Sequence, residues 1–513
     1  MKYFSTRGGP GLRSFEDVVL AGLAPDSGLY IPRDIPTLPE DWKTAWANLS
    51  YQQLAINIIG LFVSPNELPL HDLEELVNRT YTVSPSAFRE ESITPLVHLH
   101  KNTHILELFH GPTYAFKDLA LQLVGNLFEY FLGRRNAQKA PGAPPEKLTV
   151  VGATSGDTGS AAIYGLRNKA NISVFILFPE GRVSPIQEAQ MTTVLDTNVH
   201  NLSVSGTFDN CQDILKSLLA DKEFNDKHSL GAVNSINWAR ILVQIVYYFS
   251  AYFQLVKNPL VDLDHSEIQF VVPTGNFGDV LAGYYAKRLG LPMGKLGVAT
   301  NSNDILARFW KSGSYEKVDP TADAVVGGVH ATVSPAMDIA VSSNFERLLW
   351  YLAYEKAEKS DDSEKRVAAC QQVSQWMIAV KNKGAVDLST VLDGARADFI
   401  AEKVNDEQTI DTIKKYNQSH SYLADPHTAV GLHAAEVFAK SNPESTIQVV
   451  LSTAHPAKFA EAVQRAQSTF DPETVFGDLL SRERRVTAIK GTEEQLIGLV
   501  KNIIDKVASA QSS

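Results

Sequence analysis

The lysine at position 117 is the residue in this sequence best placed to act as a nucleophile. It follows the chain-turning pair Gly111-Pro112, and Thr113 is a candidate N-cap for a helix that begins there. Three apolar residues lie on the same helical face as Lys117: Leu121, Val124 and Phe128. Burial on that face and the positive end of the helix dipole both favour a neutral amine, which can attack a carbonyl carbon and form an imine. The alternative is a structural lysine whose stem covers apolar surface while its charge reaches water.

A glycine-containing loop between an apolar stretch and a helical pattern has the features of an anion site. Residues 268–272 predict a buried strand and residues 280–288 predict a helix. The loop that joins them contains Gly275, Asn276, Phe277, Gly278 and Asp279. Backbone N–H groups and the helix dipole at such a helix start favour a phosphate. Since the loop lacks the Gly-Lys-Ser/Thr ending of a P-loop and the glycine spacing of a dinucleotide fold, we expect the phosphate of another cofactor.

A second loop of small and hydroxylated residues follows the apolar stretch 147–151. It contains Thr154, Ser155, Gly156, Asp157 and Thr158. The glycine allows a ligand to approach the backbone, and the hydroxyl and N–H donors at the start of the next helix suit a carboxylate. A purely structural strand-to-helix turn would have the same composition, so the loop alone leaves both explanations open.

Two further polar segments could complete a binding site. Thr453 follows the apolar stretch 446–451, and its hydroxyl could hydrogen-bond to a heteroaromatic ring nitrogen, although a strand that ends before Pro456 is the simpler explanation. The other segment has four polar residues within seven positions: Asn234, Ser235, Asn237 and Arg240. Their amides, hydroxyl and guanidinium suit a phosphate ester, whereas a capped helix start with a structural arginine is the alternative.

The elements that must position these residues alternate between strand and helix from about residue 95 onward. The apolar stretches that predict strands are residues 105–109, 147–151, 173–178, 268–272, 295–300 and 446–451. Helical patterns follow several of them, which predicts an α/β fold of open, mostly parallel sheets covered by helices. Ligands of such folds bind beyond the carboxyl ends of the strands, so we expect the polar loops to converge.

Length and composition predict a globular chain of several domains. With 513 residues the chain is too long for a single core, and 44% of its residues are apolar. We expect an N-terminal accessory domain over residues 1–95 and a catalytic region over residues 96–455, with a helical insertion at about residues 340–420. Residues 456–513 are expected to form a C-terminal helical segment, of which residues 470–513 are expected to be peripheral.

Charge and cysteine content argue against several classes of partner. The net charge of −11 argues against nucleic acid or an anionic membrane as the main partner. Two cysteines, Cys211 and Cys370, suit a reducing compartment and leave no cysteine-rich metal site. The apolar segment 241–256 is short for a membrane span and contains polar residues, which predicts a buried helix. We therefore expect a soluble cytoplasmic protein without a metal, whose N-terminus carries no signal sequence.

An imine-forming lysine, a phosphate loop, a carboxylate loop and a ring-nitrogen partner together match pyridoxal 5'-phosphate and an amino-acid substrate. The same regions resemble fold-type II pyridoxal-phosphate enzymes, whose fold is that of the tryptophan synthase β chain, and more narrowly the longer-chain threonine synthases. The signature regions are residues 110–117, 155–159, 275–279 and 452–453, and the supporting stretches are residues 24–30, 234–240, 298–304, 343–347 and 425–431. The resemblance thus runs through nearly the whole chain.

The resemblance implies a role for each candidate residue. Lys117 would form the imine and act as general base, the turn of residues 275–279 would bind the cofactor phosphate, and Thr453 would face the pyridine nitrogen. Residues 155–158 would hold the substrate carboxylate. The implied reaction converts O-phospho-L-homoserine and water to L-threonine and phosphate by γ-elimination and β-addition of water, the last step of threonine biosynthesis. Such an enzyme is a carbon–oxygen lyase acting on phosphates.

The sequence leaves three alternatives to this function. A serine or threonine dehydratase would perform β-elimination and would need no second phosphate site. A catalytically inactive binding protein has no need of Lys117, and a nucleotide-dependent phosphotransferase would need the missing P-loop lysine. The sequence also leaves open whether the chain is a monomer or a homodimer, and whether His110, His427 or His455 takes part in proton transfer.

Overall fold

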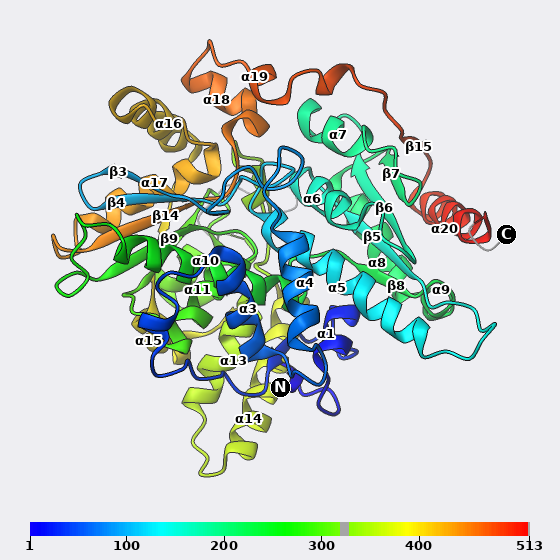
Figure 1. Cartoon of the computed structure of the whole chain (residues 1–513), viewed down its shortest axis with the longest axis horizontal. Coiled ribbons are helices and arrows are strands. Elements are labelled where there is room, and N and C mark those ends of the chain that lie inside the picture. The colour runs from blue at the N-terminus through cyan, green and yellow to red at the C-terminus, as the bar shows by residue number, and fades with distance from the viewer. Residues whose placement is uncertain (319–327, 511–513) are drawn as a thin grey trace. The chain divides into compact units, whose positions relative to one another are not determined.

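The computed structural model describes residues 1–318 and 328–510. Contacts separate two units that each combine distant segments: Met1–Ala120 with Ser235–Asp471, and Leu121–Asn234 with Pro472–Ser513. Figure 1 colours the chain from its N-terminus to its C-terminus and labels many of its elements. The domain limits expected near residues 95 and 455 are boundaries along the sequence, and they stay a prediction.

A six-stranded sheet forms the core of the larger unit. Its strand order is β13-β10-β9-β14-β4-β3, and all neighbours are parallel except β3 and β4. The strands are β3 (Leu96–His100), β4 (Thr103–Glu107), β9 (Ile268–Pro273), β10 (Leu296–Thr300), β13 (Phe399–Lys403) and β14 (Ile447–Ser452). The three central strands β9, β10 and β14 are buried along their whole lengths, as continuous apolar strands covered on both faces should be. The predicted, mostly parallel α/β fold is confirmed.

Three helices pack around this sheet: α10 (Trp238–Val256), α11 (Gly278–Leu289) and α17 (Pro426–Ala439). α11 contacts β9 and β10, α17 contacts β9, β10 and β14, and α10 packs against α11. Among the helices that the structure describes, α10 is the one long and apolar enough to cross a membrane, yet 89% of its apolar window is buried inside the protein. This burial confirms that the apolar segment is a core helix.

The N-terminal residues cover α10. β1 (Tyr3–Ser5) and β2 (Tyr30–Pro32) form an antiparallel pair. The helices of this part are α1 (Phe15–Ala21), α2 (Trp42–Ala45), α3 (Tyr51–Phe62) and α4 (Leu70–Thr80). α3 packs on α10, and the Trp42 ring makes edge contacts with Phe249 and Phe253 of α10, at centroid distances of 5.5 and 5.7 Å. These aromatic contacts attach the first segment of the chain to the core helix.

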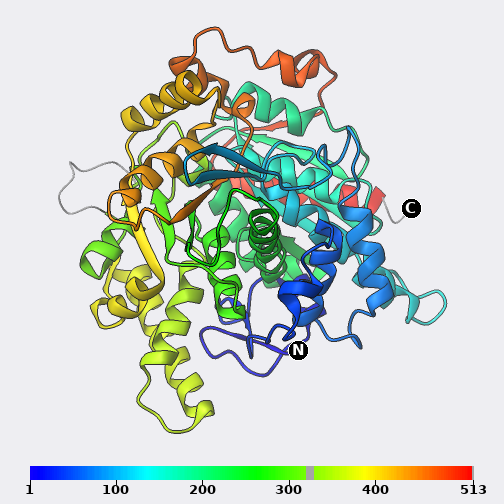
Figure 2. The same cartoon turned by 60° about the vertical axis from the view of Figure 1, so that its left-hand side comes forward.

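Helices dominate the segment after β10, as the sequence pattern predicts for much of it. They are α12 (Ile305–Ser312), η1 (Pro335–Met337), α13 (Phe345–Lys356), α14 (Asp362–Lys383), η2 (Ser389–Val391), α15 (Leu392–Asp398) and α16 (Asp406–His420), with a short strand pair β11 (Ser314–Glu316) and β12 (Ala385–Asp387) between them. α13 packs against α14, and both views show α14 (yellow-green) reaching away from the sheet (Figures 1 and 2). η3 (Pro456–Phe459) and α18 (Ala460–Ala466) follow β14.

The smaller unit contains a wholly parallel five-stranded sheet of order β15-β7-β6-β5-β8. The strands are β5 (Leu148–Ala153), β6 (Ile172–Pro179), β7 (Val199–Val204), β8 (Leu230–Ala232) and β15 (Thr487–Ile489). The helices are α5 (Lys117–Ala137) from Leu121 onward, α6 (Asp157–Leu166), α7 (Pro185–Thr192), α8 (Phe208–Ala220), α9 (Lys222–His228), α19 (Glu473–Phe476), η4 (Leu479–Ser481) and α20 (Glu493–Ala510). α5 and α6 approach so closely that a Cβ on Gly165 would lie 2.4 Å from the Leu121 carbonyl oxygen, so the position requires glycine.

The helical segment expected over residues 456–513 stays a prediction as a domain, but two of its elements, β15 and α20, contribute to the sheet and the apolar core of the smaller unit and are not peripheral. β15 pairs with β7 in parallel. Leu496, Val500 and Ile504 of α20 are buried in the same apolar cluster as residues of β6 and β7. β15 has only three residues, two of them exposed, and therefore carries no apolar pattern from which a strand could be predicted.

Candidate active site

The backbone next to Lys117 is hydrogen-bonded to the backbone of Thr453. Lys117 is the first residue of α5. The N–H of Phe116 donates to the carbonyl oxygen of Thr453 at 2.8 Å, and Ala115 pairs with Ala454 in an antiparallel bridge. The structure thus brings together two of the residues that the sequence predicts for one site, although they are 336 positions apart in the printed sequence.

The buried carboxyl group of Asp118 holds the turn before Lys117. It accepts hydrogen bonds from the N–H of Thr113 (2.7 Å) and from the Thr113 hydroxyl (2.8 Å). Burial raises the pKa of Asp118 to about 6. The expected N-cap role of Thr113 is wrong, because α5 begins four residues later and the Thr113 hydroxyl donates to Asp118. The amine of Lys458 supports the same turn by donating to the Thr113 carbonyl oxygen (2.7 Å).

Two neighbouring parallel strands end at the same edge of the sheet. One leads to the segment that pairs with residues 115–116 before Lys117 (the lysine segment), and the other leads to residues 275–279 (the glycine turn). Val450 of β14 lies opposite Val271 of β9, and the chain leaves both strands in the same direction. Thr453 follows the end of β14 directly, and Gly275 follows the end of β9 after one residue. This edge is where ligands bind in open parallel sheets.

The glycine turn is shaped to bind an anion through its backbone. Phe277, the residue that precedes α11, has a left-handed backbone conformation (φ 62°), and its side chain has no polar atom with which to cap the helix. The N–H groups at the start of α11 are therefore not capped by this residue, and the helix dipole points its positive end at the turn. A Cβ on Gly275 would lie 3.0 Å from the Met337 Cα and 3.1 Å from the Ala336 oxygen, which explains the glycine.

Residues 342–344 hold this turn in place by hydrogen bonds that the sequence did not reveal. The Ser342 hydroxyl donates to the Gly275 carbonyl oxygen (2.7 Å), and the Ser343 hydroxyl donates to Asn276 Oδ1 (3.1 Å). The Ser343 hydroxyl also lies 3.0 Å from the hydroxyl of Ser235. Ser343 thus connects the glycine turn with Ser235, one of the residues predicted to bind a phosphate ester. The signal in the sequence is a pair of serines before a helix, which resembles an ordinary helix start.

The side chain of Asp279 faces away from the turn. Its Oδ1 accepts hydrogen bonds from the hydroxyls of Tyr247 (2.5 Å) and Tyr248 (2.9 Å), both on α10. Burial raises the pKa of this carboxyl group to about 7. A phosphate on the turn can therefore interact with the backbone of Asp279 but not with its carboxylate, which would repel it.

Arg240 is buried, and the residues that the structure describes give it no carboxylate partner. Its side chain is 4% exposed, its Nε and Nη1 atoms lack hydrogen-bond partners among the described residues, and burial lowers its pKa to about 10. An unpaired buried cation is costly, so the guanidinium is well suited to bind an anion. α10 also passes beside the turn, since a Cβ on Gly278 would lie 3.4 Å from Ile241 Cδ1.

Asn237 caps a helix, which is the structural alternative considered for its segment. Its Oδ1 accepts a hydrogen bond from the Ala239 N–H (3.0 Å) and caps α10, and its Nδ2 donates to the Val19 carbonyl oxygen (2.9 Å). The amide is therefore engaged at both ends in holding the N-terminal segment to α10. Asn234, the remaining member of the predicted set, is the last residue of its segment in the smaller unit.

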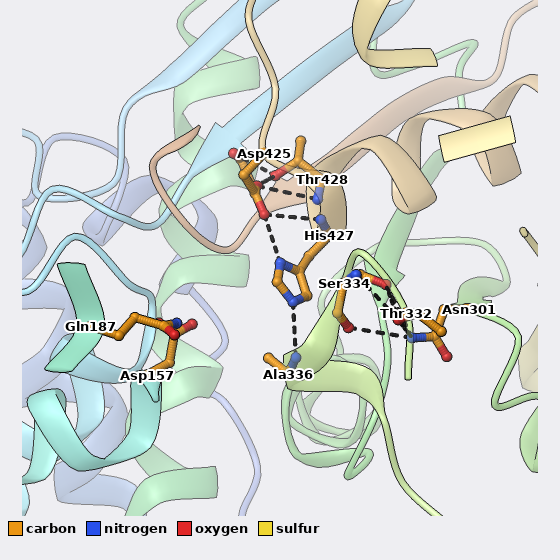
Figure 3. A network of polar contacts seen from close by, with 10 residues as sticks. Asp157, Gln187, Asn301, Thr332, Ser334, Ala336, Asp425, His427 and Thr428 are labelled. Carbon is orange, nitrogen blue, oxygen red and sulfur yellow. Dashed lines mark hydrogen bonds and ion pairs between the residues drawn. The ribbon is translucent and has the colours of Figure 1, made fainter. Parts of the chain in front are cut away.

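In the smaller unit, the loop after β5 is stabilised by two of its own side chains. Thr154 Oγ1 accepts hydrogen bonds from the N–H groups of Gly156 and Gly159, both at 2.9 Å. The Asp157 carboxylate accepts from Gln187 Nε2 at 2.9 Å (Figure 3), a contact that sequence reasoning missed. Ser155 is exposed, whereas Thr154 and Asp157 are buried. The donors that this loop offers to a ligand are therefore its backbone and the hydroxyls of Ser155 and of Thr158, which is partly exposed.

Two of the histidines considered for proton transfer have structural hydrogen bonds. His110 Nε2 lies 2.8 Å from Glu107 Oε2. His455 Nδ1 accepts from the Ala457 N–H at 3.2 Å, and burial lowers the pKa of His455 to about 4, so this ring is neutral. Neither arrangement requires a catalytic role.

The site fits pyridoxal phosphate group by group. The lysine at the helix start suits the aldehyde, the hydroxyl at the neighbouring strand end suits the ring nitrogen, and the glycine turn suits the phosphate. Three protein-family models match the chain: "Threonine synthase N terminus" over residues 2–81, "Pyridoxal-phosphate dependent enzyme" over residues 88–350 and "Threonine synthase, C-terminal" over residues 428–504. The fold, the site and these matches define a pyridoxal-phosphate-dependent enzyme of fold type II.

Comparison with individual relatives narrows the assignment from this class of enzyme to one family. The threonine synthase of Saccharomyces cerevisiae is 52% identical over 98% of this chain and 97% of its own length, and that of Pseudomonas aeruginosa is 42% identical over 95% and 96%. The crystal structure of threonine synthase from yeast superposes with a TM-score of 0.89 at 49% identity over 99% of both chains. A pyridoxal-phosphate-bound threonine synthase from Brucella melitensis gives a TM-score of 0.86 at 40% identity, also over 99% of both chains. The chain belongs to the threonine synthase family, which confirms the predicted family, enzyme class and cofactor.

Proposed function

We propose that this enzyme converts O-phospho-L-homoserine and water to L-threonine and phosphate. The observation that supports the proposal is the backbone hydrogen bond from the Phe116 N–H, next to Lys117, to the carbonyl oxygen of Thr453 after β14. The family of the chain supports the same reaction. Pyridoxal phosphate supplies the chemistry at this edge by withdrawing electrons from the substrate Cα.

Each residue of the lysine site has a distinct task in this proposal. The amine of Lys117 would hold the cofactor, and as a free neutral amine it would remove and return protons at the substrate carbons. The Thr453 hydroxyl faces the ring nitrogen and adds no charge there. The backbone of Gly275, Asn276, Phe277, Gly278 and Asp279 binds the cofactor phosphate.

The substrate is held by its carboxylate and its phosphate ester. The loop of residues 154–158 binds the carboxylate with backbone N–H groups and the hydroxyls of Ser155 and Thr158, while Thr154 and Asp157 keep the loop in shape. Arg240 and Ser235 bind the phosphate ester, because a buried guanidinium without a carboxylate partner gains most from a dianion. Asn237 is assigned to helix capping instead.

The test is a product assay with purified protein, pyridoxal phosphate and O-phospho-L-homoserine. Equal yields of phosphate and threonine are expected, because γ-elimination releases one phosphate for each water that is added. Phosphate released with 2-oxobutyrate would mean elimination without productive water addition and would overturn the proposal. Failure to form either product with the cofactor bound would show that the substrate is a different one.

We also propose a cytoplasmic location and a monomer or homodimer that has no nucleic-acid or membrane partner. Both cysteines, Cys211 and Cys370, are buried and unpaired, which suits a reducing compartment. The net charge of −11 disfavours polyanionic partners. Cell fractionation and sedimentation analysis test the two parts of this proposal separately.

A further inference from the structure

The glycine turn packs against a short segment, residues 332–337. Side chains from two other elements hold this segment in position. The backbone of Ala336 and Met337 lies directly behind Gly275, close enough to exclude a Cβ there. On one side, Asn301 Nδ2 at the end of β10 donates to the hydroxyls of Thr332 (2.8 Å) and Ser334 (3.0 Å), as Figure 3 shows. Any shift of this segment would therefore change the room available to the turn.

On the other side, the segment is held by His427 at the start of α17. The N–H of Ala336 donates to His427 Nε2 at 3.1 Å, and His427 Nδ1 lies 2.8 Å from Asp425 Oδ1 (Figure 3). His427 is 2% exposed and Asp425 is fully buried. Because a backbone N–H can only donate, Nε2 must be an acceptor and the ring must carry its proton on Nδ1.

Asp425 fixes this ring orientation while also supporting the end of β14. Its carboxylate accepts hydrogen bonds from the N–H of His427 (2.9 Å) and from the hydroxyl of Thr428. The same Thr428 hydroxyl lies 2.9 Å from the hydroxyl of Ser452, the residue before Thr453. One buried carboxylate therefore connects the strand end beside Lys117 with the segment that supports the glycine turn.

We propose that His427 is a positioning residue for the cofactor phosphate. As the Nδ1–H tautomer it holds the Ala336 peptide, and through it the backbone behind Gly275, in the place that the phosphate turn needs. The inference rests on the proposed function, because it assumes that this turn binds the cofactor phosphate. It does not make His427 a catalytic residue, since the ring contacts neither the turn nor Lys117 in the described hydrogen bonds.

Two substitutions separate the two hydrogen bonds of the ring. In His427→Asn, the shorter amide can still donate to Asp425 but no longer reaches the Ala336 N–H. In His427→Gln, the longer amide places an oxygen near the position of Nε2 and can accept from Ala336. His433→Asn is the matched control, because His433 lies on the same helix but its Nδ1 is near Thr412 of α16 (3.3 Å).

The measurement is the dissociation constant of the full-length, cofactor-depleted protein for pyridoxal phosphate and for pyridoxal, which lacks the phosphate. A lost hydrogen bond to a buried N–H predicts that H427N weakens pyridoxal phosphate binding about tenfold and pyridoxal binding less than about twofold. H427Q should restore most of the loss, and H433N should bind both compounds like the parent. General destabilisation would weaken both compounds together, and that result would overturn the proposal.

Two further variants test separately whether the glycine turn binds the cofactor phosphate and whether His427 positions it. Gly275→Ala, or Ser342→Ala if the first variant does not fold, alters the turn itself and should also weaken only the binding of pyridoxal phosphate. If these variants show no phosphate-dependent loss, the turn is not the phosphate site and the proposed function is wrong on this point. If they show the loss and H427N does not, the turn assignment stands and the role of His427 is refuted.

Discussion

The hydroxyl of Tyr81 donates to the carbonyl oxygen of Leu119 at 2.8 Å, inside the first turn of the helix that begins with Lys117. Tyr81 follows α4, is 1% exposed and packs its ring edge against Tyr51 (centroids 5.0 Å). The N-terminal segment, in which we predict no catalytic residue, therefore contributes directly to the position of Lys117, the proposed nucleophile.

Replacing Tyr81 with Phe should destabilise the protein and disturb the lysine. Removal of one buried hydrogen bond to the backbone predicts a loss of about 1 kcal/mol in the free energy of unfolding, measured by urea denaturation. The maximal rate should fall while the KM for substrate changes little, since the substrate contacts are elsewhere. Tyr252→Phe on α10 is the control, and it should stay within about 0.5 kcal/mol of the parent. Equal effects of the two variants would show that the Tyr81 contact has no special role.

Replacing Lys117 with Ala should abolish both turnover and the near-visible absorption of the lysine-bound cofactor. Lys117 is the lysine that begins α5, and the nearby Lys458 amine is engaged with the Thr113 carbonyl oxygen, so we expect no substitute for the Lys117 amine. Absorption spectra of the purified variant with added pyridoxal phosphate provide the measurement, and alanine at the exposed Lys381 provides the control. A Lys117 variant that keeps the absorption band would refute the assignment.

Much of the fold follows from local patterns, because its central strands are continuous apolar stretches followed by polar loops, most of them glycine-containing. β6 and β9 have this form, and β14 is an apolar strand followed by a polar loop without glycine; all three strands are buried throughout. The edge strand β15 could not be predicted in this way. Its partner β7 lies more than 280 positions earlier in the printed sequence, and the pairing supplies the stability that its three residues lack alone.

The candidate site likewise contains residues that the local sequence predicts and residues whose role depends on contacts between distant parts of the chain. Lys117, the glycine turn and Thr453 are found from the residue types that follow predicted strands. The residues that orient them are not, because Asp118, Ser342 and Gln187 resemble ordinary helix and loop residues until the fold brings them to their partners. The direction of the Asp279 side chain is likewise decided by tyrosines of another helix, which the loop sequence does not reveal.

Replacing Arg240 with Met should improve stability while it impairs function. The guanidinium is buried and partly unpaired, so an apolar side chain of similar length is expected to raise the free energy of unfolding of the substrate-free protein by about 1 kcal/mol or more. The KM for O-phospho-L-homoserine should rise about tenfold or more, because a charge-assisted contact is lost. Arg240→Lys should not restore the parent KM, since an ammonium lacks the planar fork. A variant that is less stable and has an unchanged KM would make Arg240 a structural residue.

Replacing Asp279 with Asn should change the pH dependence of stability. The pKa of this carboxyl group is 3.8 in its ordinary state and about 7 in the folded protein, because of burial. Between about pH 4 and pH 7 the folded state therefore holds a proton that the unfolded state has lost, and the stability from this group disappears as the pH rises through that range. Asn has no ionisation to lose, so D279N should equal the parent near pH 4 and exceed it by about 1–4 kcal/mol at pH 8, as measured by urea denaturation.

The same variant tests which part of Asp279 serves the cofactor. Asn is nearly isosteric with Asp and its oxygen can still accept from Tyr247, so the turn should keep its shape and its backbone donors. The dissociation constant for pyridoxal phosphate at pH 7 should then stay within about threefold of the parent value, measured against Asp262→Asn as an exposed control. A loss of a hundredfold would mean that the carboxylate itself takes part in binding. In that case Asp279 would have to leave its tyrosine partners when the cofactor is bound.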